Sequence, residues 1–465
     1  MGGAMVRRNL ILISFDTLRF DALSAAPDRR LLGEDASLAQ TPTLDRIAGE
    51  GTFFARAVTT APYTSTSHAS IFTGTYWPKH GVMDLFDCPM RAEAEPLAAA
   101  LRERRYRTAQ NAGRGRSRGD MFELDRVGLN RGYESHAFGG WLKRRTLRWL
   151  RDAIGSGPWY LFFHTMAVHR PYGRSHRKFR ALVRRDIAEG KPFERVRRLY
   201  LRNVSDVDRR FGHLWERLRE AGALDETLVV ILSDHGEGLS VHGSVHCNPG
   251  GWQEGICRVP MIFWCPGLVK AGQVIEEPIS TVDVAPTIAQ LLDMGWGPSL
   301  GFDGVSAARV VTGEQPASTL RGRECFFFAT MGRGGTQPPI MQGLVKGATK
   351  YVSFAQVQEE QWQRLRGKWL DASRSRKKQS RCYNMEQLLK RHERGELELL
   401  LDVVTDPGEM RNLAQERPAL LDELRSAMER WLRENRAEAA AVPPPPGEAA
   451  GKDTLRRLKQ LGYLD

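Results

Sequence analysis

The chain has 465 residues, of which 41% are hydrophobic and 26% charged. This length favours one large domain with a smaller one, and this composition is that of a soluble globular protein rather than a disordered or fibrous one. The formal net charge of +13 suits an anionic substrate or surface. The basic residues are spread along the chain without a recognisable nucleic-acid-binding module, which disfavours nucleic acid as the partner. We interpret the six cysteines as reduced thiols, because they lack paired metal-binding spacing.

The first predicted element is a buried parallel strand over residues 9–14, and Asp16 follows it. A short apolar run that ends on an acid is typical of a strand and not of a signal-peptide core. No apolar stretch approaches the ~18 residues that a membrane-spanning helix needs, so we expect a cytoplasmic protein without a transmembrane segment. Open α/β sheets place their sites beyond the carboxyl ends of the strands, which makes Asp16 a candidate site residue. A helix N-cap is the alternative role.

A helix that ends on glycine is predicted over residues 41–51, and a cluster of hydroxyl side chains follows it at residues 61–74, APYTSTSHASIFTG. The cluster predicts a turn leading into a helix N-terminus, where unsatisfied N–H groups and the helix dipole attract an anion. Thr64 lies at its chemical centre. A nucleophile at this position is well placed to attack an anionic ester.

The middle of the chain predicts two more buried strands that end near polar residues. Residues 159–164 form the first, and His169 follows it; residues 227–232 form the second, and Asp234 and His235 follow it. A long helix is predicted between them, over residues 200–222. We interpret two polar residues on this helix as contributors to the fold: Asp208 and His213.

The pattern changes to short strands from about residue 321. We therefore predict a main domain over residues 1–320 and a small-sheet subdomain over residues 321–440. Residues 366–394 are strongly basic and are interpreted as a surface or partner element. Four consecutive prolines within residues 441–465 predict a stiff linker, after which residues 455–463 predict a terminal helix that docks back.

The run TSTSHASIFTG at residues 64–74 resembles the signature of the sulfatase family of the alkaline phosphatase superfamily, usually C-x-P-S-R-A-x-x-x-T-G. Other stretches resemble motifs of the same family in the same order: DTLRFD at 16–21, TLVVILSDHGEG at 227–238 and EGICRVP at 254–260. The resemblance extends over nearly the whole chain. It implies an α/β fold with a central mixed, mostly parallel sheet flanked by helices, and a smaller C-terminal α+β part with a short antiparallel sheet.

This chain departs from the signature at two positions. Thr64 stands where sulfatases oxidise a Cys or Ser to formylglycine, and His68 stands at the arginine. Threonine cannot become formylglycine. The resemblance therefore implies an unmodified threonine nucleophile, as in the superfamily's nucleotide pyrophosphatases and its phosphoethanolamine and phosphoglycerol transferases, with His68 on the substrate. It shifts the expected substrate from sulfate to phosphate esters.

The resemblance also implies a metal site formed by Asp16, Asp234 and His235, with the Thr64 hydroxyl as a fourth partner. Two carboxylates and an imidazole suit Zn²⁺ or Mn²⁺ and are workable for Ca²⁺ or Mg²⁺. True sulfatases more often have Asp-Asn where this chain has Asp-His, so His235 favours the softer metals. The further ligands of the two-zinc enzymes are not evident in the sequence, and we predict one divalent ion.

The substrate-contacting residues of the family are matched less closely. His169 matches the histidine of D-P-H-x-P-Y, which contacts the sulfuryl or phosphoryl group. The lysine that sulfatases place before the glutamate at position 254 is missing; His246 is our candidate for its role at the leaving oxygen, and His242 is the alternative.

A Lys and a His that the family places on the substrate are missing as well. Asn111 or one nearby arginine could replace them, because guanidinium groups bind phosphate in bidentate fashion. A solvated run of charge is the other interpretation of these arginines, which are Arg114, Arg116 and Arg118.

Our leading hypothesis is a metal-dependent hydrolase or transferase that cleaves phosphate mono- or diesters through Thr64. Its substrate would be an anionic small-molecule, glycan or lipid ester. Two alternatives stay open: a sulfuric ester hydrolase that does not use formylglycine, and a non-catalytic anion-binding protein on the same fold.

Overall fold

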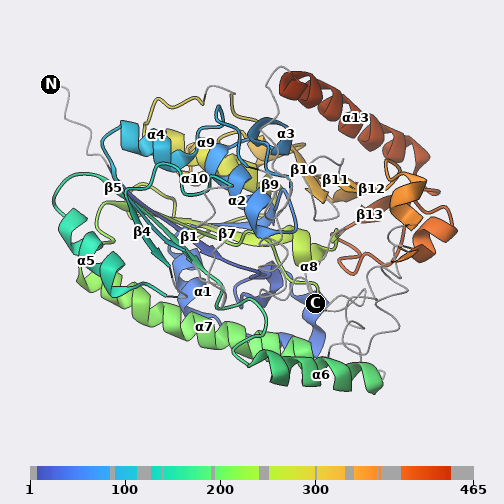
Figure 1. The fold of residues 1–465 in the computed structure, drawn as a ribbon, viewed down its shortest axis with the longest axis horizontal. Helices are drawn as coiled ribbons and strands as arrows, with labels where there is room; N and C mark the ends of the chain where they lie inside the picture. Colours follow the sequence, from blue (N-terminus) through green and yellow to red (C-terminus); the bar gives the residue numbers. More distant parts are fainter. Residues whose placement is uncertain are drawn as a thin grey trace.

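The computed structural model describes residues 8–83, 89–112, 127–138, 141–189, 194–239, 251–298, 301–329, 340–363, 366–367 and 389–440. They form a large central sheet with helices on both of its faces, and a second, smaller sheet beside it (Figure 1). The His242, His246 and Arg114–Arg118 predictions lie outside the described residues, as do the prolines and the helix expected near the C-terminus.

The central sheet has the strand order β4-β3-β5-β1-β6-β7-β2-β8, and β9 also pairs with β2. From β4 to β6 all neighbours are parallel, whereas β7 runs antiparallel to both β6 and β2. This mixed, mostly parallel sheet confirms the predicted fold class. Its strands are β1 (Asn9–Phe15), β2 (Thr52–Val58), β3 (Arg107–Ala112), β4 (Ser135–Phe138), β5 (Trp159–Thr165), β6 (Thr227–Leu232), β7 (Arg258–Trp264), β8 (Gln273–Ile275) and β9 (Ile279–Ser280).

Helices cover both faces of this sheet. One face packs against α2 (Thr64–Thr73), α4 (Leu97–Glu103), α9 (Val284–Leu291) and α10 (Ala308–Val311). The other packs against α1 (Pro42–Gly49), α5 (Arg144–Ala153), α6 (His176–Ala188) and α7 (Glu194–Glu220). Shorter elements complete the layers: α3 (Trp77–His80), α8 (Glu254–Cys257) and the 3-10 turns Phe20–Ala22, Arg30–Leu38, Thr281–Asp283 and Ala317–Leu320.

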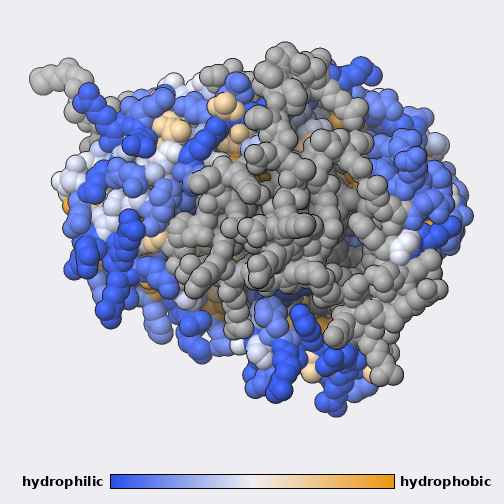
Figure 2. Space-filling view, viewed as in Figure 1, coloured by the Kyte–Doolittle hydropathy of each residue, from blue (hydrophilic) through white to orange (hydrophobic). Residues whose placement is uncertain are grey.

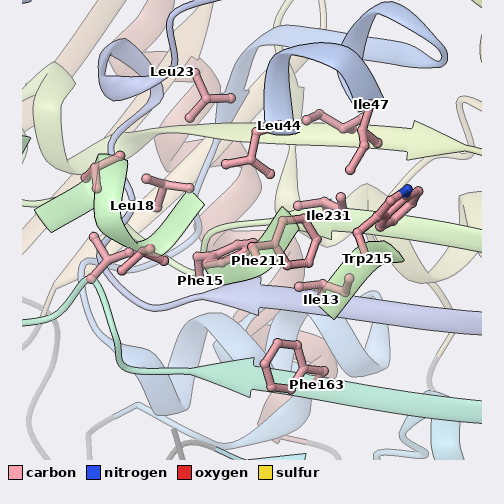
Figure 3. Packing of buried hydrophobic residues seen from close by; sticks show 14 of the residues in the cluster. Ile13, Phe15, Leu18, Leu23, Leu44, Ile47, Phe163, Phe211, Trp215 and Ile231 are labelled. Carbon is pink, nitrogen blue, oxygen red and sulfur yellow. The ribbon is translucent and has the colours of Figure 1, made fainter. Parts of the chain in front are cut away.

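Strand β1 is buried on both sides, as its continuous apolar sequence predicts for a central parallel strand. Alternate side chains enter opposite cores: Leu12 lies in the core under α2, and Ile13 and Phe15 lie in the core under α7. Figure 3 shows Phe15 beside Phe211 of α7, with ring centroids 5.2 Å apart in an edge-on contact. This core fixes the end of β1, where Asp16 follows.

Helix α7 begins six residues before the predicted start, because Val196 continues the apolar stripe of Tyr200 and Val204 by one more turn. As predicted, Asp208 serves the fold: its carboxylate accepts hydrogen bonds from the backbone of Thr43 (3.0 Å) and Leu44 (2.9 Å) in the first turn of α1. No helix within the described ranges is long and apolar enough to span a bilayer.

The second sheet is antiparallel and has the order β10-β11-β12-β13. It confirms the predicted small C-terminal sheet, while the domain boundaries themselves stay a prediction. Helix α13 (Pro418–Ala440) packs on it, and the ring of Trp431 stacks on Phe326 at 4.7 Å and on Phe328 at 5.1 Å (Figure 1). The strands are β10 (Glu324–Ala329), β11 (Met341–Lys346), β12 (Thr349–Ser353) and β13 (Glu398–Asp402).

Candidate active site

Four chain segments meet at one edge of the central sheet. Asp16 follows β1, His164 lies near the end of β5, and Asp234 lies two residues beyond β6. These three strands are adjacent and parallel, with β1 in the middle, so their carboxyl ends share one edge. Thr64, the first residue of α2, completes the group.

Asp16, Asp234 and His235 offer three ligand atoms that all lie within 4.8 Å of one another. The Nε2 atom of His235 is 3.5 Å from Asp234 Oδ2 and 3.9 Å from Asp16 Oδ1. Its Nδ1 donates a hydrogen bond to the Gly236 carbonyl at 2.9 Å, which directs Nε2 and its lone pair towards the two carboxylates.

Electrostatics make this arrangement fit a cation. Asp16 Oδ1 and Asp234 Oδ2 are buried, and neither accepts a hydrogen bond from any described residue. Burying a carboxylate oxygen that accepts no hydrogen bond costs folding free energy unless a positive charge compensates it. A divalent ion held by Asp16, Asp234 and His235 would satisfy all three atoms at once, so the predicted ligands fit the group that the sequence motif implies.

Thr64 is the first residue of α2 and is 1% exposed. Its hydroxyl donates to Asp16 Oδ2 across 3.5 Å, a long contact that places Oγ1 beside the carboxylate–imidazole group. Among the described residues, the N-cap Tyr63 is extended (φ −156°, ψ 153°) and its side chain does not cap this helix end. The buried Thr66 hydroxyl in the same turn also has no hydrogen bond to the described part of the chain. The first turn of α2 therefore offers donors to an anion.

His68 lies directly beneath Thr64 and is fully buried. Its Nδ1 donates to the Thr64 carbonyl at 2.9 Å, and its Nε2 accepts from the Ser14 hydroxyl at 2.9 Å. Burial lowers the pKa of His68 to about 3, so the ring is neutral. His68 thus holds the first turn of α2 against β1, and its expected substrate contact stays a prediction.

His164 is a site residue that sequence reasoning missed. Its Nε2 lies 3.5 Å from Asp16 Oδ2, and its ring centroid is 5.2 Å from that of His68. Burial lowers its pKa to about 4. The only available signal was a histidine within an otherwise apolar strand. The register that sets His164 opposite Ser14 on β1 cannot be obtained from that pattern.

A sulfatase family model matches residues 8–294. The chain belongs to the sulfatase family. It is 32% identical to human arylsulfatase D over 180 residues, which are 36% of this chain and 26% of that protein. The arylsulfatase of Clostridium perfringens (strain 13 / Type A) is 22% identical over 61% of this chain and 74% of that protein. The chain matches only about a quarter of the length of the first of these relatives.

Solved structures share the fold at low identity. The phosphonate monoester hydrolase of Agrobacterium radiobacter has a TM-score of 0.64 and is 20% identical, over 93% of this chain and 96% of that chain. The sulfatase fold thus covers both the central and the C-terminal sheet of this chain.

In this sulfatase-family chain, His169 lies in the loop after β5 and is 8% exposed. Its Nδ1 donates to the Arg170 carbonyl at 2.9 Å. Three residues on, the Tyr172 hydroxyl donates to Glu237 Oε2 at 2.9 Å, which joins this loop to the one that carries His235. Burial raises the pKa of Glu237, against the opposing influence of His169 and His235. Glu237 was also missed, although it follows His235 closely in the sequence.

Asn111 is not brought to this group. Its Oδ1 accepts from the Lys143 backbone at 3.2 Å and from the Thr146 hydroxyl at 2.9 Å, at the start of α5. It pairs with Phe163 across the sheet, on the face covered by α5 and α7, whereas His68 and α2 cover the opposite face. Both of these hydrogen bonds hold the N-terminus of α5. A substrate contact by Asn111 stays a prediction.

Proposed function

We propose that this chain is a metal-dependent hydrolase or transferase that cleaves phosphate mono- or diesters with Thr64 as nucleophile. The observation that carries the proposal is the position of the Thr64 hydroxyl, at the N-terminus of α2 and 3.5 Å from Asp16 Oδ2. Oxidation of a threonine side chain would give a ketone, because its β-carbon carries a methyl group. The aldehyde chemistry of formylglycine is therefore closed to this residue.

Asp16, Asp234 and His235 would hold the divalent ion, with the Thr64 oxygen as a fourth ligand. The mixed carboxylate and imidazole set favours Zn²⁺ or Mn²⁺ over Ca²⁺ or Mg²⁺. Once bound, such an ion lowers the pKa of the hydroxyl and withdraws charge from the ester's non-bridging oxygens. His164 lies close enough to Asp16 to orient that carboxylate.

The protein's own groups then complete the transfer. Thr64 gives its proton to Asp16 Oδ2 and forms the new bond to phosphorus, while the bond to the leaving oxygen breaks and its electron pair stays on that oxygen. The N–H groups of α2 and His169 stabilise the added charge. His246, or alternatively His242, would protonate the leaving oxygen. The phosphothreonine then passes its phosphoryl group to water or to an acceptor alcohol, and Thr64 regains its proton.

Sulfate ester hydrolysis is the second candidate, because curated relatives that match this chain include proteins named arylsulfatases. A structural neighbour named as a phosphonate monoester hydrolase is compatible with phosphorus chemistry on the same fold. A purely binding protein would gain little from burying two carboxylates and an imidazole beside a hydroxyl, since such burial costs free energy without a cation.

The test is turnover of aryl phosphate monoester, aryl phosphodiester and aryl sulfate by the Mn²⁺- or Zn²⁺-loaded protein, beside Thr64→Ala and Thr64→Ser. Phosphoester turnover that Thr64→Ala abolishes and Thr64→Ser retains is the expected result. Sulfatase activity that survives Thr64→Ala would show that the threonine is not the nucleophile. Failure of the protein to bind either metal at neutral pH would overturn the enzymatic proposal as a whole.

A further inference from the structure

The helices that cover the two faces of the central sheet differ in charge. On one face, α5, α6 and α7 together contain 17 lysines and arginines but 7 aspartates and glutamates. On the other face, α2, α4, α9 and α10 together contain two arginines and one glutamate. The first three helices thus hold an excess of ten positive charges, in a chain whose formal net charge is +13. A charge excess on one side attracts an anionic partner to that side.

The charges of α6 lie on its solvent side. Phe179 and Val183 are buried against the core, whereas Arg177, Arg180 and Arg184 are exposed. Their spacing of i, i+3 and i+7 places the three arginines in one stripe along the helix. We call these three residues the α6 stripe.

Helix α7 carries a similar stripe and packs against α6. Its Arg198, Arg202 and Arg209 are exposed and recur at i, i+4 and i+11, so they share one side of the helix. The 27 residues of α7 make it about 40 Å long. Figure 1 places α5, α7 and α6 along the lower side of the molecule, and Figure 2 shows that the lower edge is covered mainly by hydrophilic residues. We call the solvent side of these three helices the basic face.

The protein neutralises only part of the charge on the basic face. Arg198 and Arg209 of α7 form ion pairs with acidic neighbours at 2.9 Å each. In the described part of the chain, no acidic group forms an ion pair with the α6 stripe, although the next residue, Arg185, pairs with Glu189. The α6 stripe therefore keeps its charge available to a partner from outside the chain.

We propose that the basic face docks the protein on an anionic lipid bilayer. A bilayer carries its charge in two dimensions, so its headgroups can meet α5, α6 and α7 at the same time. A strand or duplex of nucleic acid would meet the same broad face along one line. Clusters of lysine and arginine on the polar side of a helix are the recognised means of attraction to anionic headgroups. The proposal is independent of the proposed function, because the basic face lies apart from the residues around Thr64.

The uncharged residues of the basic face support this choice of partner. Single-stranded nucleic acid stacks on exposed aromatic rings, and protein partners bind through exposed aromatic or apolar anchors. The aromatic rings of α5, α6 and α7 are instead buried in the core, and they are Trp149, Phe179, Tyr200, Phe211 and Trp215. The exposed large apolar side chains of the described chain lie outside these helices. We therefore expect adsorption to the headgroups without insertion, which salt reverses.

Cosedimentation of the full chain with lipid vesicles tests the proposal. Vesicles of phosphatidylglycerol and phosphatidylcholine in equal amounts are compared with vesicles of phosphatidylcholine alone, at low and at high salt. The stripe variant carries Arg177→Gln, Arg180→Gln and Arg184→Gln. A lysine variant replaces the same three arginines by lysine, which keeps the charge and removes the planar guanidinium groups.

The control variant loses the same charge from exposed residues of other elements, by Arg102→Gln, Lys270→Gln and Arg433→Gln. We expect the stripe variant to bind the mixed vesicles roughly 100-fold more weakly than the wild type at low salt. The control and lysine variants should stay within about threefold of the wild type, because a bilayer responds to the charge near its surface. High salt should release the wild type from the mixed vesicles, and phosphatidylcholine alone should not bind it.

Several results would overturn the proposal. Equal losses in the stripe and control variants would show that net charge alone drives the binding. A loss in the lysine variant as large as in the stripe variant would indicate a specific anion site instead of a docking face. Duplex DNA serves as the competing probe: a stripe variant that loses DNA binding but keeps vesicle binding would make the basic face a nucleic-acid surface. Thr64→Ala should bind vesicles as the wild type does, so the docking face and the proposed function are tested separately.

Discussion

Replacing Lys350 by methionine tests how the small sheet is joined to the region of the active site. Lys350 of β12 is fully buried, and its Nζ lies 2.5 Å from Glu254 Oε1, 2.7 Å from Glu409 Oε1 and 3.0 Å from the Trp252 carbonyl. Methionine preserves much of the side-chain volume but removes the ammonium group that the two buried carboxylates share. Removing one partner of a buried ion pair costs about 3–5 kcal/mol, and we expect the upper part of that range here because two carboxylates lose the same partner.

Hydrogen exchange across β11–β13, together with the urea midpoint, measures this loss, because exchange reports the local free energy of opening in a chain of several parts. Lys346→Met is the matched control on the neighbouring strand. Its Nζ lies 3.2 Å from Glu324 and 3.0 Å from Glu423 at the partly exposed surface, where such pairs are worth about 1 kcal/mol or less. The double variant Lys350→Met/Glu409→Gln should recover part of the stability, since it removes one of the stranded charges. Equal effects of the two single variants would refute the reasoning.

Three further predictions concern pH, metal binding and the support of the nucleophile. Burial raises the pKa of Glu409 from 4.5 to about 7, so the folded state binds the proton more tightly and stability falls as pH rises between these values. Glu409→Gln should remove up to about 3 kcal/mol of this pH dependence, measured by urea titrations at several pH values. An unchanged slope of unfolding free energy against pH would contradict the prediction. Zn²⁺ or Mn²⁺ at 100 times its dissociation constant should stabilise the wild type by about 2.7 kcal/mol and should not stabilise Asp234→Ala. Calorimetry should show about 10–100-fold weaker metal affinity in His164→Ala. Equal affinity in all three proteins would place the metal elsewhere. His68→Phe should lower kcat for an aryl phosphate while metal affinity stays within a few fold, because His68 holds the helix turn that carries Thr64; a parallel loss of metal affinity would instead make His68 part of the metal site.

The sequence was most informative where the signal was local. The buried strands that precede Asp16 and Asp234, and the helix that starts at Thr64, follow from apolar runs and hydroxyl clusters that are contiguous in the chain. Because parallel strands share one carboxyl edge, those runs place the two carboxylates at the same edge of the sheet. That they meet depends on the strand order, which sets β1 beside β6. Their distances and the orientation of the His235 ring need the structure, since the latter depends on the Gly236 carbonyl.

The features that sequence reasoning missed depend on contacts between distant parts of the chain. His164 reaches Asp16 through the register of β5 against β1. Glu254 forms its ion pair with Lys350 of the second sheet. The family motif instead led us to expect a lysine just before Glu254 in the sequence. Asn111 is the opposite case. Its position in a segment that resembles the family made it a candidate substrate contact, but its side chain lies on the face of the sheet that α5 covers.

The ion pairs of Lys350 with Glu254 and Glu409 also link the small sheet to the site. Glu254 begins α8, and the Gly236 and Glu237 backbone N–H groups donate to the carbonyls of Ile256 (2.8 Å) and Gly255 (2.9 Å) in that same short helix. The loop that carries His235 therefore rests on α8, and α8 is held by a lysine from β12. A shift of β12 would move the backbone on which the His235 ring depends, so the Lys350→Met variant should weaken metal binding as well as the small sheet, whereas Lys346→Met should leave metal affinity unchanged.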